Sequence, residues 1–198
     1  MSPQRSVVAN IALSLDGRVT GPGGEYDMGW IVPHALSAGA RAHMVRVTGP
    51  ATTALLGRKN YQGFAGFWPA VAGDENAHPD DRTFAGWLNG VEKVVFSTTL
   101  TEVEWDNARL ASSDPATTVR ELRRQDGGDI IVLASSSVIR QLLDADEVDQ
   151  LSITLCPELV GGGARLFEDG PAGSWKLTDS TVTDSGAMCL LYDRSREE

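Results

Sequence analysis

The sequence predicts an α/β fold with a mostly parallel central sheet, helices on both faces of the sheet and an antiparallel pair of strands at the C-terminal edge. Short apolar runs alternate with helix-like segments through the middle of the chain, and only strand-like segments follow from residue 150 onward. Residues 130–134 form a wholly apolar run, as expected for a strand buried on both faces. The 198 residues contain no linker rich in proline, glycine, serine or charge, so we expect one domain, residues 1–198.

The first half of the chain is expected to contribute strands and helices in turn. An apolar strand covers residues 7–15 and ends at an Asp-Gly turn, with a short continuation at residues 18–20. Apolar residues then recur on one helical face over residues 34–47, and Pro33 stands at the start of this predicted helix. The other predicted elements are a strand at 53–56, a helical turn at 60–64 followed by a long loop through Trp68, a helix at 83–88 and a strand at 93–97.

The second half is expected to hold two helices and the closing strands. Asp114 and Pro115 have the residue types of a helix N-cap and first helical position, which predicts a helix to about residue 124. A run of three serines precedes the apolar positions of a second helix, over residues 138–143. A strand is predicted at residues 150–155, and an antiparallel pair at 175–182 and 187–192 around an Asp-Ser-Gly turn.

The formal net charge of −10 argues against nucleic acid and anionic membranes as general partners. Any anion that binds must therefore be held by a local cluster of donors. Cys156 and Cys189 lie in apolar, strand-like stretches, so we expect buried reduced thiols and no metal site. The first residues lack a long apolar segment, and no apolar run has the length of a membrane span, so a cytoplasmic location is expected.

Polar and basic residues follow three of the predicted strands, where the next helix or loop begins. These turns are Gly57-Arg58-Lys59, Ser97-Thr98-Thr99 and Ala134-Ser135-Ser136-Ser137. Ligands of open α/β sheets bind at the carboxyl ends of the strands, and backbone N–H groups, hydroxyls and cations hold phosphate oxygens. Each turn alone also fits an ordinary helix cap or a solvated surface pair. Together they favour a nucleotide phosphate site, although the chain has neither a P-loop nor a Gly-x-Gly-x-x-Gly fingerprint.

Several short motifs follow one another in an order that carries a resemblance. They are residues 8–17 (VANIALSLDG), 56–61 (LGRKNY), 95–98 (VFST), 157–163 (PELVGGG) and 166–167 (LF). In this order the chain resembles the dihydrofolate-reductase-like superfamily, and most closely the reductase domain of the bifunctional riboflavin-biosynthesis deaminase/reductase. The resemblance covers nearly the whole chain. It implies a dihydrofolate-reductase-like three-layer fold and agrees with the sheet predicted above.

The resemblance also implies NADPH as hydride donor. Arg58 and Lys59 would meet the adenosine 2′-phosphate or the pyrophosphate, and the serine run would place backbone N–H groups on the pyrophosphate. The implied cofactor-binding residues are Ala12, Gly57, Arg58, Lys59, Ser97, Thr98, Ala134, Ser135, Ser136, Ser137 and Val138. The implied substrate-binding residues are Ser14, Asp16, Gly17, Trp30, Pro33 and Leu159. Asp16 is the candidate catalytic residue, while Glu25, Asp27, His34 and water are other candidate proton sources.

Two departures from the family pattern bear on function. The family usually has glycines directly after the central strand, where this chain has Ala134 and the serine run. The folate-binding carboxylate of dihydrofolate reductases would fall near Ala35, so a pterin would lack its partner and its route for protons. The chain also lacks the zinc-deaminase signature of the bifunctional proteins.

The sequence therefore predicts an NADPH-dependent reductase of a small heterocyclic or ribitylaminopyrimidine-type substrate. An NADPH reductase of another small carbonyl, imine or dihydrofolate is the alternative among enzymes. A non-catalytic dimeric ligand-binding protein with the same fold is the alternative from another class. The relatives suggest a homodimer that uses a C-terminal strand as contact.

Overall fold

The structure, a computed structural model, describes residues 5–168, 170 and 172–195 and contains one eight-stranded sheet. The strand order is β4-β3-β2-β5-β1-β6-β8-β7, and β8 alone runs antiparallel to its two neighbours. The strands are β1 Val7–Ser14, β2 Ala51–Gly57, β3 Glu92–Phe96, β4 Ala108–Leu110, β5 Asp129–Leu133, β6 Gln150–Cys156, β7 Ser174–Val182 and β8 Met188–Ser195. The predicted α/β class, the mostly parallel sheet and the antiparallel C-terminal pair are confirmed.

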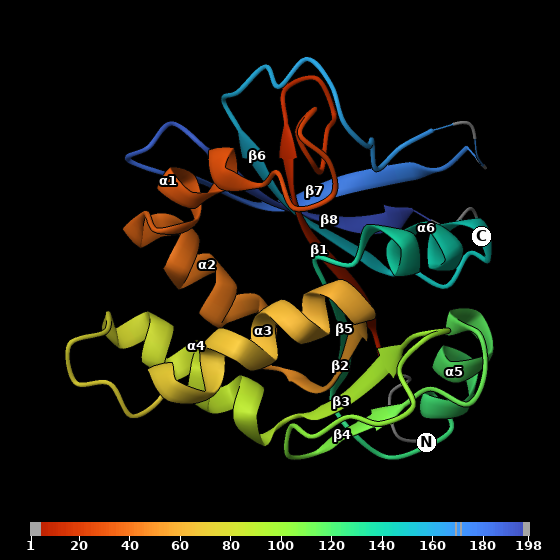
Figure 1. Ribbon diagram of the computed structural model, residues 1–198. Coiled ribbons are helices and arrows are strands. Elements are labelled where there is room, and N and C mark those ends of the chain that lie inside the picture. The colour runs from red at the N-terminus through yellow and green to blue at the C-terminus, as the bar shows by residue number, and fades with distance from the viewer. Residues whose placement is uncertain (1–4, 169, 171, 196–198) are drawn as a thin grey trace.

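Helices cover both faces of this sheet and make three layers (Figure 1). The helices are a 3₁₀ turn η1 Gly29–Ile31, α1 Val32–Ala35, α2 Ala38–Thr48, α3 Arg58–Val71, α4 Pro79–Gly90, α5 Pro115–Leu122 and α6 Ser136–Asp144. Helices α2, α3 and α4 pack on one face, with Ile131 and Leu133 of β5 in their core cluster. Helices α5 and α6 pack on the other face, to which β5 contributes Ile130 and Val132.

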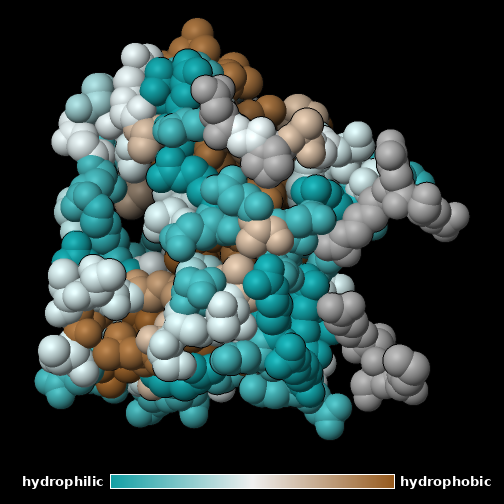
Figure 2. Space-filling view, turned by 90° about the vertical axis from the view of Figure 1, so that its right-hand side faces the viewer, coloured by the Kyte–Doolittle hydropathy of each residue, from teal (hydrophilic) through white to brown (hydrophobic). Residues whose placement is uncertain are grey.

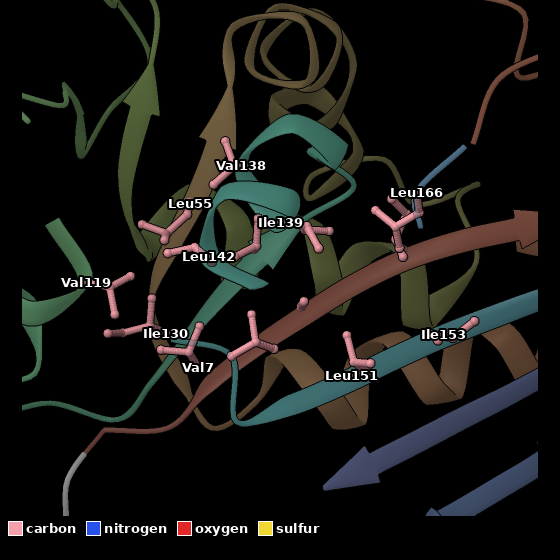
Figure 3. Close-up of a cluster of buried hydrophobic side chains, with 14 of the residues drawn as sticks. Val7, Leu55, Val119, Ile130, Val138, Ile139, Leu142, Leu151, Ile153 and Leu166 are labelled. Carbon is pink, nitrogen blue, oxygen red and sulfur yellow. The ribbon is translucent and has the colours of Figure 1, made fainter. Parts of the chain in front are cut away.

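The core under α6 shows how the layers are joined. Val138, Ile139 and Leu142 of α6 point toward Leu55 of β2 and Ile130 of β5 (Figure 3). All five side chains are almost fully buried. The side of the molecule that carries α5 and α6 is mostly hydrophilic, with smaller hydrophobic areas at the top and lower left of the view (Figure 2). A hydrophilic outer surface is expected for amphipathic helices that bury their other face.

The single helix expected over residues 34–47 is wrong, because the chain is broken there into α1 and α2. Ser37 takes extended dihedral angles and its hydroxyl accepts a hydrogen bond from the Ala40 N–H at 3.4 Å, which starts α2 afresh. Leu36 falls in the break and is 52% exposed, so it does not belong to the buried face that the pattern assigned to it.

The long loop expected through Trp68 is also wrong, because α3 continues to Val71. The Trp68 ring packs edge-on against Phe84 of α4 at 4.6 Å between centroids, and this packing extends the helix despite Pro69 near its end. Helix α4 begins at Pro79, earlier than expected, because His78 caps it through the Asp80 N–H. The three-residue strand β4 was not predicted, and residues 18–20 form only an isolated bridge from Arg18 to Arg165.

Buried charged side chains tie together the amino end of the parallel strands. Arg5 donates hydrogen bonds to backbone carbonyls and threonine hydroxyls of three segments, and Lys93 donates to three carbonyls at the end of α4. Burial lowers the pKa of Lys93 to about 8. Arg123 pairs with Glu147 at 3.3 Å and Asp149 at 2.6 Å. Most polar groups of these side chains are thus bound within the protein, and the exception is the buried Nε of Arg123, which has no hydrogen-bond partner among the described residues.

Both cysteines are buried and free, as expected, and burial raises the pKa of the Cys156 thiol to about 11. No helix within the described ranges is long and apolar enough to cross a membrane. The same residues hold no group of three or more metal-binding side chains.

Candidate functional site

The three polar turns line one cleft of about 1060 Å³ at the carboxyl ends of β2, β3 and β5. Residues 57–60, 96–99 and 134–138 form its floor and one side. The loop from Val19 to Met28 and the short stretch Gly163-Ala164 form the opposite side. The expectation that these turns lie close together is therefore met by the geometry. Among the residues that line the cleft are three cations, Arg58, Lys59 and Arg140.

Two helix N-termini that face the cleft differ from the starts of α2, α4 and α5. Gly57 precedes α3 and Ser135 precedes α6, and neither residue gives its helix a side-chain cap in the described structure. In α2, α4 and α5 the cap side chains of Ser37, His78 and Asp114 accept from first-turn N–H groups. The first N–H groups of a helix have no intrahelical partner, and they carry positive partial charge. The N-termini of α3 and α6 can therefore donate to an anion in the cleft.

The two basic residues after β2 have different partners. The Arg58 guanidinium donates to the Thr99 hydroxyl at 3.1 Å, which holds it beside the turn after β3. Lys59 forms an ion pair with Glu25 on the opposite side of the cleft. Arg58 thus contacts a neutral hydroxyl, whereas an anion that approached Lys59 or Arg140 would compete with the carboxylate of Glu25 or Glu168.

The serine run after β5 serves two purposes. Ser135 is 2% exposed, and its hydroxyl accepts from the Gly57 N–H and donates to the Leu133 carbonyl, both at 2.8 Å. This hydroxyl therefore belongs to the protein's own framework rather than to a ligand. Ser136 and Ser137 are more accessible and lie in the first turn of α6. Ala134 has a φ of 49°, a left-handed conformation that favours glycine. An alanine at this position, where the family pattern has glycine, therefore carries some backbone strain.

The turn after β3 is also partly structural. The Ser97 hydroxyl accepts hydrogen bonds from the Thr99 N–H at 3.1 Å and the Leu100 N–H at 2.9 Å. Thr98 and Thr99 are exposed in the cleft. Threonine hydroxyls, rather than that of Ser97, are the side-chain donors that this turn offers to a ligand.

The residues after β1 form a network of their own beside the cleft. Asp16 accepts hydrogen bonds from the Ser14 hydroxyl at 2.7 Å and from the backbone N–H groups of Val160 and Gly161 at 3.0 Å. The Ser14 hydrogen bond, followed by the backbone ones, holds the pKa of Asp16 far below its usual range. These hydrogen bonds keep Asp16 ionised and join the loop after β1 to the loop after β6. The catalytic role of Asp16 stays a prediction.

The predicted substrate residues, the predicted cofactor-binding residue Ala12 and the candidate proton source His34 do not line this cleft. Ala12 is half-buried within β1, and Pro33 and Leu159 are exposed, Leu159 at 79%. The indole Nε1 of Trp30 is buried and has no hydrogen-bond partner among the described residues. His34 is buried, with Nδ1 at 3.1 Å from the Ser185 hydroxyl and Nε2 at 3.0 Å from Glu158, which favours a structural role.

Three residues that shape the cleft were not among the predicted cofactor-binding or substrate-binding residues. Asn60 donates to the Ala134 carbonyl at 2.9 Å, Thr99 receives the Arg58 guanidinium, and Glu25 pairs with Lys59. Asn60 and Thr99 directly follow residues that were chosen, so their positions gave a signal. Glu25 was weighed only as a proton source, because nothing local to it indicates a partner 34 positions away.

A comparison with protein families finds a match to the RibD C-terminal domain over residues 5–189. Protein YyaP of Bacillus subtilis (strain 168) is 25% identical over 191 residues, which are 96% of this chain and 95% of that protein.

Three solved structures share the fold. A protein of Shewanella sp. PV-4 assigned to riboflavin biosynthesis has a TM-score of 0.70 at 23% identity, over 96% of this chain and 99% of that one. The Thermotoga maritima diaminohydroxyphosphoribosylaminopyrimidine deaminase/5-amino-6-(5-phosphoribosylamino)uracil reductase has a TM-score of 0.67 at 15% identity, over 97% of this chain and 57% of that one. Enterococcus faecalis dihydrofolate reductase, complexed with NADP(H) and RAB-propyl, has a TM-score of 0.61 at 16% identity over 98% of both chains. The dihydrofolate-reductase-like fold implied by the sequence is confirmed.

Proposed function

This chain belongs to the RibD C-terminal domain family, and we propose that it acts there as an NADPH-dependent reductase of a small heterocyclic substrate. The substrate class is that of 5-amino-6-(5-phosphoribosylamino)uracil, on which the Thermotoga maritima relative is named as acting. The observation that carries the proposal is the convergence of the α3 and α6 N-termini and Arg58 on one cleft.

The residues present fit a dinucleotide that carries several phosphates. The N–H groups at the starts of α3 and α6 would hold the pyrophosphate, and Arg58 with Thr99 would hold the adenosine 2′-phosphate. The chain has a net charge of −10, so these local donors must overcome a repulsive field. Bound NADPH would supply the hydride.

The protein's share of the chemistry is binding and orientation. Holding the two reactants in contact removes most of the entropic cost of their encounter. Asp16 is kept ionised by its hydrogen bonds, and His34 is held between Ser185 and Glu158. We therefore propose that the proton reaches the substrate from water.

Titration with NADPH and NADH, followed by nicotinamide fluorescence, tests the cofactor. We expect NADPH to bind at least about tenfold more tightly than NADH, since one lost charge-assisted hydrogen bond has that effect. Absence of binding by either dinucleotide at millimolar concentration would overturn the proposed function. Equal affinities would overturn the 2′-phosphate contact with Arg58.

Oxidation of NADPH in the presence of 5-amino-6-(5-phosphoribosylamino)uracil tests the substrate. Turnover supports the riboflavin-pathway substrate. Binding of NADPH without turnover would overturn this substrate and leave two candidates, a reductase of another small carbonyl or imine and a non-catalytic ligand-binding protein with the same fold.

We also propose a homodimer that uses the C-terminal strands. Strand β7 is an edge of the sheet, and Leu177, Val182 and Met188 are exposed apolar residues on β7 and β8. A long edge strand with apolar neighbours is commonly covered by a partner. Light scattering should give twice the chain mass, and Val182→Asp should give a monomer.

The cytoplasmic location stays a prediction that cell fractionation can test.

A further inference from the structure

The turns after β2 and β5 are joined to each other by side chains. Ser135 accepts from the Gly57 N–H and donates to the Leu133 carbonyl, both at 2.8 Å. Asn60 donates from Nδ2 to the Ala134 carbonyl at 2.9 Å and to the Ser135 hydroxyl at 3.3 Å. We call these two side chains with their hydrogen bonds the Ser135–Asn60 bracket.

The bracket continues the connection between β2 and β5 beyond the end of their pairing. The last paired residues of these neighbouring parallel strands are Leu55 and Val132. Beyond this pair, β2 leads into α3 and β5 leads into α6, and the residues of the two turns do not pair with each other in the sheet. The Ser135 hydroxyl spans this gap, and its one donor and two acceptor sites are all used.

The same bracket holds a strained backbone in place. Ala134 has a φ of 49°, which costs an L-residue free energy and persists only because the surrounding contacts enforce it. Its N–H donates to the Asn10 carbonyl at 2.9 Å, and its own carbonyl accepts from Asn60. Both backbone groups of Ala134 are therefore bound, and the direction in which α6 leaves the sheet is defined.

We propose that Ser135 and Asn60 are positioning residues that set the separation of the α3 and α6 N-termini, so that one dinucleotide is held by both. This inference rests on the proposed function, because it assumes that the ligand reaches from one helix start to the other. Neither side chain need touch the ligand. A ligand that contacts only the corner around Arg58 should not depend on the bracket.

The test compares a whole dinucleotide with one of its fragments. Dissociation constants for NADPH and for adenosine 2′-monophosphate are measured by calorimetry for the wild-type protein, Ser135→Ala, Asn60→Ala and the double variant. We expect each single substitution to weaken NADPH about tenfold, because either one breaks the bracket between the two helix starts, and to weaken the fragment less than about twofold. The double variant should be only slightly weaker than either single one, since the two side chains act in one bracket.

Ser37→Ala is the matched control, because it also removes a buried serine hydroxyl from the N-cap position of a helix, and Ser37 does not line the cleft. It should lower thermal stability and leave the NADPH dissociation constant unchanged. Circular dichroism verifies that each variant is folded. If Ser135→Ala does not fold, the half-buried Asn60→Ala carries the test.

The possible outcomes separate failure of this inference from failure of the proposed function. Loss of NADPH affinity without loss of fragment affinity supports the bracket. Equal loss for both ligands shows general damage to the cleft and overturns it, as does unchanged NADPH binding in both variants. Failure of the wild-type protein to bind NADPH overturns the proposed function, and the inference falls with it.

Discussion

The two ends of the parallel strands treat their polar groups in opposite ways. At the amino end, Arg5, Lys93 and Arg123 are each bound by several carbonyls, hydroxyls or carboxylates of the protein. At the carboxyl end, the starts of α3 and α6 lack side-chain caps in the described structure, and Arg58 reaches only a threonine hydroxyl. We call the amino end closed, because its charged side chains are bound within the protein, and the carboxyl end open, because its helix starts and Arg58 can bind a ligand.

This difference separates stability from binding. A polar group that the protein satisfies adds to the free energy of unfolding, and removing its partner leaves a buried group unpaired. A group left unsatisfied adds little to folding but can add to ligand affinity. Substitutions at the closed end should therefore change stability alone, and substitutions at the open end should change affinity alone.

The largest effect should come from Arg123→Ala at the closed end. This substitution removes Arg123 from the carboxylates of Glu147 and Asp149, while Arg120 still pairs with Glu147 at 2.6 Å. The free energy of unfolding should therefore fall by about 3–4 kcal/mol, the lower part of the range for a broken buried pair. Urea denaturation measures the change. Arg109→Ala is the matched control, since its pair with Glu92 is far more exposed and should matter by less than about 1 kcal/mol. Equal effects of the two substitutions would mean that the closed end is not special.

The next effect should appear at His43, a second closed site on α2. Burial, followed by nearby Arg46, lowers the pKa of His43 to about 4. Arg46 donates to Nδ1, so Nε2 carries the proton and donates to the Ser152 hydroxyl at 2.8 Å.

Between pH 6.5 and about pH 4, His43 is therefore protonated in the unfolded chain and neutral in the folded chain. Stability should fall as the pH is lowered through this window, by about 3 kcal/mol in all. His43→Gln should flatten that part of the curve, because it removes the buried group whose pKa differs between the folded and unfolded chain. A wild-type stability that is constant over the window would refute this view of His43.

A smaller change, in affinity rather than stability, should follow from Arg58→Ala at the open end. Loss of a charged hydrogen-bond donor should weaken NADPH by about 1.5–3 kcal/mol and leave the urea midpoint unchanged. NADH should be affected much less. Arg124→Ala, which removes the same charge at an exposed site after α5, is the control. If both dinucleotides weakened equally, Arg58 would bind the pyrophosphate instead.

The smallest effect should come from Glu25→Gln, which removes the carboxylate that pairs with Lys59 across the cleft. Since exposed ion pairs contribute about 0.2–1 kcal/mol, NADPH should bind up to about fivefold more tightly. High salt should diminish the gain. Glu121→Gln, an exposed change on α5, controls for net charge. Weaker binding would show that the Glu25–Lys59 pair closes over the ligand rather than competing with it.

Much of the fold could be predicted from local patterns. The apolar run in β5, the alternation in β6 and the Asp114-Pro115 start of α5 each appear where the sequence indicated. The predictions were wrong where tertiary contacts determine the local structure. Ser37 caps a new helix and so splits the predicted one, and Trp68 packs on Phe84 and extends α3. A periodicity of apolar residues contains no information on either contact.

The candidate site divides in the same way. The sequence by itself determined that three polar turns follow three strands, because strand and turn propensities act over a few neighbouring residues. Only the tertiary structure decided which of their groups stay open to a ligand. Ser135 is used by Gly57, which lies 78 positions away, and Lys59 is used by Glu25. Such partners are set by how the strands are ordered in the sheet, so no local pattern could distinguish the Ser135 hydroxyl from those of Ser136 and Ser137.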